Sequence, residues 1–316
     1  MQSPEHFVFL LVPEFTHIAF SCAIEPLRIA NLVSGETLYQ WTLASEDGEA
    51  ATCSNGTVTL VNCGYDTIPD CDRLFVLSGI HVQNHVSQPL LNVLRKARVS
   101  RAKLGALCSA AHVLAKAGML DGMRAAIHWD FHDGFMEEFP EVNLVSSVFV
   151  ADETIITASG GTATADLMLH LIAQAHGNDL SVAVADQMVY NAVREGTAEQ
   201  RVSLQSRHGM RNPHLVKAIE TMSENLETPI APMQIAQDIG ISTRQLERIF
   251  GRYMNCSPKK YYVDLRLQKA RNLLVQTDRS VTEIALACGF ESPGHFSRVY
   301  RAKYGITPTA QQNRLS

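Results

Sequence analysis

One cysteine occurs where a short apolar run changes abruptly into a helix-like segment, in KLGALCSAAHVLAKAG (103–118). If the apolar run is a strand, Cys108 lies at a sharp strand-to-helix turn. Such a turn exposes its central side chain and aims the following backbone N–H groups at a ligand, as in a nucleophile elbow. The N-terminus of the following helix would favour a thiolate and any anionic group. Cys108 could therefore be a nucleophile, a residue that lines a ligand pocket, or part of the core.

The elements around Cys108 predict how it is positioned. Four runs have the composition of strands, and the middle ones are apolar on both faces: HFVFLLV, YQWTLAS, DRLFVLS and KLGAL. Helical patterns alternate with them at 18–33, 87–98, 110–117 and 163–176. This alternation predicts an α/β sheet with helices on both sides. Ligands of such sheets bind at the carboxyl ends of the strands, where Cys108 lies.

The N-terminal part resembles the PfpI-type, class I glutamine amidotransferase-like family. The resemblance is carried by VPEFTHIAFSCAIEPLRIAN (12–31), LSG (77–79), LCSAAHVLAKAGMLDG (107–122), AAIHWD (125–130) and ITASGGTATADLMLHLI (156–172). It implies a flavodoxin-like parallel sheet sandwiched by helices, which we expect over residues 1–192. It also implies that Glu25 lies beside the elbow, that Gly79 is the glycine of the gate loop, and that His128 lies across the pocket.

Two departures from that family bear on chemistry. Ser109 follows the cysteine where the proteases have histidine, and Ala110 replaces a usual glycine, which narrows the space for a substrate backbone. We therefore expect a ligand sensor and no enzyme, with Cys108 and Ser109 among the ligand contacts. A Cys-dependent amidase or peptidase remains the competing hypothesis. Trp129 is expected in the core or at the pocket, because aromatic faces near a carboxylate suit a quaternary ammonium ligand.

The composition limits the other classes of function. A chain of 316 residues suits two domains, and no apolar run approaches the roughly 18 residues of a membrane span. We expect a cytoplasmic protein without membrane contact. The seven cysteines form no CxxC pair and no Cys/His spacing typical of zinc, so we predict no disulfide framework, no metal site and no cofactor.

The charge is divided unevenly along the chain. From Pro213 onward there are 14 Lys and Arg against 9 Asp and Glu, a net +5, whereas residues 1–212 have 13 against 23, a net −10. A basic C-terminal part attached to an acidic one indicates an anionic partner for the C-terminal part alone.

The C-terminal hundred residues contain a repeat. IAQDIGISTRQLERIF (235–250) aligns with IALACGFESPGHFSRVY (284–300), so that Gly240 matches Gly289 at an offset of 49. Positions after the turn match at an offset of 50, because the second copy has one additional residue there. A duplicated segment of this kind predicts a duplicated structural unit.

Each copy has the pattern of a helix-turn-helix. The turn glycine ends one helix, and Ser242 or Ser292 begins the next as its N-cap, with Gln245 completing a capping box in the first copy. Apolar residues then point the second helix inward. The outward positions of the two second helices are Thr243, Arg244, Glu247, Arg248, Gly294, His295, Ser297 and Arg298.

A single helix is predicted between the copies, from Pro258 to Gln276. At 1.5 Å per residue it spans about 28 Å, close to the roughly 34 Å that separates successive major grooves on one side of B-DNA. Both second helices could thus reach one side of a duplex.

Residues 213 to 312 resemble the DNA-binding domain of the AraC/XylS family of transcription regulators, down to the ending GFESPGHFSRVYRAKYGITP. The resemblance implies an all-α domain of seven helices, binding to direct repeats in double-stranded promoter DNA, and RNA polymerase as a partner. It also implies that base or phosphate contacts come from Thr243, Arg244, Glu247, Arg248, His295, Ser297 and Arg298.

The polar segment 193–212 is predicted to be a linker, and the DNA-binding domain is expected over 213–316. The helices at 163–176 and 179–194 are apolar enough to bury the interface of a homodimer. EPLRIAN, LYQWTLASEDG and VADQMVYNAVREGTAEQR resemble the regulators that sense amine metabolites. That resemblance implies an activator of small-amine catabolism that responds to glycine betaine, dimethylglycine or carnitine, or alternatively to arginine.

Overall fold

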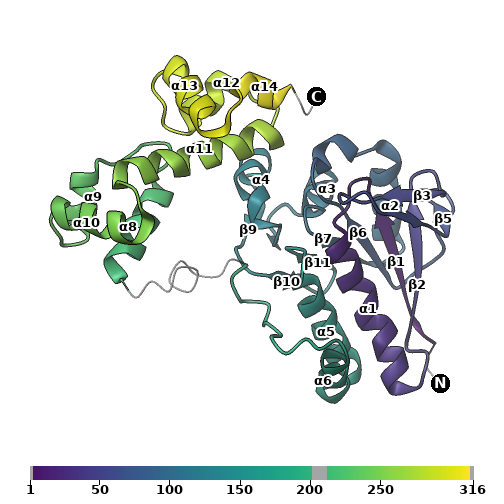
Figure 1. Cartoon of the computed structure of the whole chain (residues 1–316). Coiled ribbons are helices and arrows are strands. Elements are labelled where there is room, and N and C mark those ends of the chain that lie inside the picture. Colours follow the sequence, from purple (N-terminus) through teal and green to yellow (C-terminus); the bar gives the residue numbers. More distant parts are fainter. Residues whose placement is uncertain (1–2, 201–211, 314–316) are drawn as a thin grey trace. The chain divides into compact units, whose positions relative to one another are not determined.

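The computed structural model describes residues 3–200 and 212–313 and divides the chain into two compact units, Met1–Gln200 and Arg201–Ser316 (Figure 1). The first unit extends eight residues beyond the domain end expected at 192. Residues 193–200 of the expected linker therefore pack with the first unit, and residues 201–211 lie outside the described part. In the described residues, no helix combines the length and apolar character needed to cross a membrane.

The first unit is built on a seven-stranded sheet in the order β10-β11-β7-β6-β1-β2-β5. β10 pairs antiparallel with β11, and the other pairs are parallel. The strands are β1 Glu5–Leu11, β2 Tyr39–Ser45, β5 Cys63–Gly64, β6 Arg73–Leu77, β7 Lys103–Leu107, β10 Phe149–Ala151 and β11 Ile155–Ala158. All four predicted strands are confirmed. Two small ladders lie outside the sheet, β3 Ala50–Thr52 with β4 Val58–Leu60, and β8 Arg124–Ala125 with β9 Asn143–Leu144.

Helices cover both faces of this sheet, which confirms the predicted fold class (Figure 1). One face packs against α1 His17–Ser34, α5 Ala163–His176 and α6 Asn178–Gln187. The other face packs against α2 Gln88–Val99 and α3 Ala111–Lys116. Shorter helical elements are η1 Val82–His85, η2 Trp129–Phe131 and α4 His132–Glu138.

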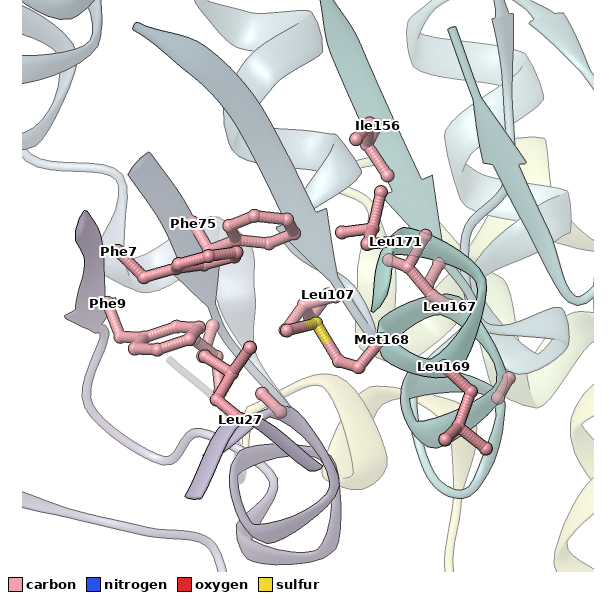
Figure 2. Packing of buried hydrophobic residues seen from close by; sticks show 14 of the residues in the cluster. Phe7, Phe9, Leu27, Phe75, Leu107, Ile156, Leu167, Met168, Leu169 and Leu171 are labelled. Atoms are coloured by element: carbon pink, nitrogen blue, oxygen red, sulfur yellow. The ribbon is translucent and has the colours of Figure 1, made fainter. Parts of the chain in front are cut away.

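The central strands are apolar on both faces because each face has its own core. In β1, Phe7 and Phe9 point toward α1 and α5 and pack with Phe75 of β6 (Figure 2). The intervening Val8 and Leu10 belong to the opposite core, with the side chains of α2 and α3. Residues of a strand alternate between faces, so two buried faces require a continuous apolar run.

The predicted helix 179–194 is wrong in its second half, because α6 ends at Gln187. Val189 has a positive φ of 54°, which turns the chain back toward α5. There the hydroxyl of Tyr190 and the guanidinium of Arg194 both donate to the carboxylate of Asp166, whose side chain is fully buried. A buried carboxylate needs such donors, and the helix ends early enough to provide them.

The second unit has seven helices over residues 212–313, as the resemblance implied. They are α8 Pro213–Glu224, α9 Pro232–Asp238, α10 Thr243–Met254, α11 Pro258–Gln276, α12 Val281–Ala287, α13 Pro293–Tyr304 and α14 Pro308–Gln312. Each repeat forms one core, and α11 contributes to both. Its bounds agree with the predicted long helix.

Candidate functional site

The strand order places a topological switch point at the carboxyl end of the sheet. β1 has β2 on one side and β6 on the other, so the connections after β1 and β6 leave in opposite directions. This reversal is where ligands bind in open α/β sheets. The loop after β1 meets the loop after β6, since Phe15 forms an isolated antiparallel bridge with Gly79.

The predicted elbow is confirmed. Cys108 directly follows β7 and has a positive φ of 65°, a strained conformation for a residue with a side chain. Its sulfur lies 3.3 Å from the hydroxyl oxygen of Thr16, and its backbone N–H donates to the carbonyl of Ala158. Gly160 closes the other side, because a Cβ there would lie 2.6 Å from the Cβ of Cys108. Gly160 thus lets the segment after β11 approach the elbow closely.

The expected thiolate is not favoured at this elbow. Burial raises the pKa of the Cys108 thiol, and hydrogen bonds from Thr16 and from the backbone of Ser109 offset this only in part. The cysteine is 5% exposed. The cost of burying a negative charge exceeds the benefit of the adjacent backbone donors, so the thiol stays protonated at neutral pH.

Ser109 fastens the elbow to the loop after β6. Its hydroxyl donates to the carbonyl of Gly79 at 2.6 Å, and its oxygen lies 2.8 Å from the hydroxyl of Ser78. Ser109 is fully buried. Gly79 is required because a Cβ would lie 2.2 Å from the carbonyl oxygen of Glu14. The structure thus joins Gly79, Cys108 and Ser109 in one packed cluster.

The other predicted ligand contacts lie around this cluster or away from it. The backbone N–H of His128 donates to the carbonyl of Cys108, and burial lowers the pKa of its imidazole. The ring of Trp129 lies beside it, tilted by 33°, with the ring centroids 5.4 Å apart. Glu25 lies on α1, about 12 Å along the helix from its first residue, and its carboxylate is paired with Arg28 at 2.7 Å. Thr16, and not Glu25, contacts the cysteine.

Sequence reasoning missed a second charged group at this edge of the sheet. Glu14 has a positive φ of 61°, and its carboxylate oxygen lies 3.1 Å from the ring nitrogen of His81 and 3.2 Å from that of His85. Burial acts to raise the pKa of the Glu14 carboxyl, but the two histidines outweigh it and lower the pKa. Its position after β1 was visible in the sequence, but the strand order that brings it beside the loop after β6 was not. Within the described ranges, no cluster of His, Cys, Asp and Glu is suited to a metal ion.

The predicted DNA-reading positions lie on α10 and α13, the second helices of the two helix-turn-helix units. Ser242 and Ser292 cap these helices by accepting from the N–H of the third residue on. Arg244, Glu247, Arg248, His295 and Arg298 are exposed, while Thr243 and Ser297 are partly buried. Matching positions of the repeat are buried together, as Leu246 and Phe296 are. The geometry therefore presents two similar polar helix faces.

The long helix α11 contacts both helix-turn-helix units. The hydroxyl of Tyr262 donates to the carbonyl of Asn225 and accepts from the N–H of Ile230, next to the first helix-turn-helix unit. One helical turn later, the guanidinium of Arg266 donates to the carbonyls of Cys288 and Gly289, at the turn of the second helix-turn-helix unit. These two side chains were not singled out from the sequence.

Comparison with known proteins agrees with this architecture. Residues 7–174 match the model of the DJ-1/PfpI family, and residues 235–314 match a helix-turn-helix domain. The chain is 40% identical to the HTH-type transcriptional regulator GbdR of Pseudomonas aeruginosa over 97% of this chain and 84% of that protein. It is 41% identical to the HTH-type transcriptional regulator CdhR of the same species, over 96% of this chain and 90% of that protein.

A solved structure supports the fold of the first unit. The crystal structure of an AraC family transcriptional regulator from Pseudomonas putida superposes with a TM-score of 0.54 at 24% identity, over 58% of this chain and all of that chain. Together, the matched regions and the full-length relatives show that this chain belongs to the DJ-1/PfpI family, among those members that are transcription regulators with an AraC-type helix-turn-helix domain.

Proposed function

We propose that this chain activates genes for the catabolism of a small amine, and that it responds to a quaternary ammonium or amino-acid-like metabolite such as glycine betaine or carnitine. The observation that carries the proposal is the pair of helix-turn-helix units joined by α11, attached to an α/β unit whose elbow cysteine is closed and protonated. Relatives that match over 96–97% of this chain are named transcriptional regulators, which supports a regulatory function. Arginine is the alternative effector.

The proposal assigns no reaction to the elbow. A cysteine hydrolase needs an accessible thiolate and a base within hydrogen-bond reach. Cys108 is 5% exposed, and its sulfur lies beside a threonine hydroxyl. The competing hydrolase hypothesis would require the removal of Thr16 and Gly160 from its two sides. We propose instead that the effector is recognised at the carboxyl edge of the sheet beside the packed cluster of Gly79, Cys108 and Ser109, where His128 and Trp129 are partly exposed, with Glu25 at the periphery.

The proposed activator has three kinds of partner. Arg244, Arg248 and Arg298 would contact guanine edges or phosphates of promoter DNA, since arginine is the residue best suited to both. A homodimer would place two such units on direct repeats, and an activator bound there would contact RNA polymerase. Access to promoter DNA requires the protein to work in the cytoplasm.

The DNA-binding part is tested with a duplex that the wild-type chain recovers from fragmented genomic DNA. Arg298→Ala should weaken binding to that duplex about 5-fold to 150-fold, the loss of about 1–3 kcal/mol expected for one arginine at a base edge. Arg252→Ala is the control, because Arg252 lies on the last turn of α10 and is exposed. Mobility shift at several salt concentrations gives the readout. Equal affinities for both variants and wild type would contradict the assignment of α13 to DNA.

The sensing part is tested by thermal shift of the full chain with glycine betaine, carnitine, dimethylglycine and arginine. At 100 times its dissociation constant an effector adds about 2.7 kcal/mol to stability. Cys108→Ala should bind the duplex as the wild type does. Neither protein should show amidase or peptidase turnover. Amidase or peptidase activity that disappears in Cys108→Ala would overturn the sensor in favour of the hydrolase.

A further inference from the structure

A pocket of about 590 Å³ lies in the first unit, and none of its lining residues belongs to the elbow. It is formed by α5, α6, the edge strand β10 and residues 193–197. Its apolar lining includes Phe149, Leu169 and Ala173. The volume is within the range of about 300–1,000 Å³ that is typical of small-molecule sites.

The charges around this pocket indicate what it could bind. Asp166 and Arg194 line it but are paired with each other at 2.7 Å. Arg124, Asp152 and Glu195 also line it, and no ion pair is recorded for them in the described part of the chain. Two carboxylates and one guanidinium are thus left for a ligand, and the whole lining has a net charge of −1 with histidine neutral. The complementary ligand has two cationic groups and one carboxylate.

Two flat rings complete the lining. The rings of Phe149 and His170 have centroids 5.3 Å apart. Burial lowers the pKa of the His170 imidazole, so its ring is neutral at pH 7 and does not repel a cation. The Phe149 ring is 5% exposed and is covered by Gly196, so the partly exposed ring of His170 is the flat face left for a ligand. A planar guanidinium stacks on such a face better than a compact ammonium does.

One wall of the pocket is the segment that leads toward the DNA-binding unit. Asp166 holds this segment by accepting from the backbone N–H and the guanidinium of Arg194. Gly196 packs directly on the ring of Phe149, because a Cβ there would lie 2.8 Å from that ring. A ligand in contact with both α5 and this wall would fasten the segment further. The chain continues from this segment into residues 201–211 and then into α8.

We propose that this pocket binds a basic amino acid, with its carboxylate directed to Arg124 and its two cationic groups to Asp152 and Glu195. This is a second site, separate from the elbow. Its regulatory consequence, a change in promoter binding through the wall at 193–197, rests on the proposed function. The binding itself does not.

The test is isothermal titration of the full chain with L-arginine. Ala173→Trp fills the pocket and should weaken L-arginine binding at least 30-fold. Ala175→Trp is the matched control, since Ala175 lies on the same helix, is exposed, and does not line the pocket. It should bind as the wild type does. Glycine betaine, with one cationic group, should bind this site at least 10-fold more weakly than L-arginine.

Charge variants make the test independent of packing damage. Asp152→Asn and Glu195→Gln keep the size of the side chain and should each weaken L-arginine binding about 2-fold to 5-fold, as expected for exposed charge pairs. Absence of L-arginine binding by the wild type, or equal binding by Ala173→Trp, would overturn the second site. If L-arginine binds as proposed but changes no affinity for the recovered duplex, the site stands and its regulatory role in the proposed function fails.

Discussion

The two helix-turn-helix units are copies in sequence, but the structure holds them differently. Gly240 and Gly289 end the first helix of each unit with φ of 76° and 71°. Around Gly240 there is open space for a Cβ, whereas at Gly289 a Cβ would lie 2.6 Å from the carbonyl oxygen of Leu226 and 2.7 Å from Pro229. The first glycine is needed for its backbone conformation alone. The second is also needed because the turn packs against the loop between α8 and α9.

Further contacts increase this difference. The first helix of the second unit, α12, begins with a capping box in which Ser280 and Glu283 satisfy each other's backbone N–H groups. Its counterpart α9 begins after Ala231, which has no side-chain cap. Arg266 of α11 stacks on Phe290 at 4.0 Å and binds the second turn. The comparison teaches that two copies of one motif can keep the same backbone turn while only the second copy depends on contacts with distant residues to hold it.

The largest expected effect comes from the two turn glycines. Gly289→Ala should destabilise the second helix-turn-helix unit by about 3 kcal/mol. A residue with a side chain costs about 1–2 kcal/mol in the left-handed backbone conformation, and the overlap with Leu226 adds to that cost. Gly240→Ala should cost about 1 kcal/mol. Hydrogen exchange of the full chain, followed over α9–α10 and α12–α13 peptides, measures both. Equal losses would remove the distinction between the units.

The next effect comes from the arginine that joins α11 to the second turn. Arg266→Ala should cost about 2 kcal/mol, because two carbonyls lose a charged donor and Phe290 loses its stacking partner. Arg266→Lys should recover less than half, since an ammonium cannot reproduce the planar fork. Arg252→Ala in the first helix-turn-helix unit, where Arg252 is exposed beside Tyr253, should change stability by less than about 0.5 kcal/mol. Urea unfolding that finds Arg266 and Arg252 equivalent would contradict this account.

The smallest effect concerns the caps. Ser280→Ala should lower the stability of the second helix-turn-helix unit by about 1 kcal/mol. Ala231→Ser should raise the stability of the first helix-turn-helix unit by up to about 1 kcal/mol. The hydrogen bonds from Ser280 lower the pKa of the Glu283 carboxyl. Its contribution is therefore present above the unfolded pKa and is lost as the pH falls through the lower, folded value. Thermal melts at pH 7 and pH 3 should show the difference between wild type and Ser280→Ala shrinking in acid. A constant difference would show that Glu283 takes no part.

Sequence patterns identified the strands, the bounds of α11 and the duplicated unit, because apolar periodicity and capping residues act over a few neighbouring positions. The elbow at Cys108 was predicted for the same reason. The end of α6 at Gln187 was not predicted, because it depends on a contact with Asp166, which lies in the first turn of the preceding helix α5.

Contacts between distant segments decided the rest. The sequence shows a cysteine at a strand end, but only packing places Thr16 and Gly160 against it and keeps its thiol protonated. A glutamate on an apolar helix suggested a pocket, yet Arg28 one turn away takes its charge at the surface. By itself, the sequence determined the elements and the DNA-reading repeat, which follow from local periodicity. The tertiary structure alone decided burial, ionisation and the unpaired charges of the second pocket, because these depend on which distant groups exclude water from one another.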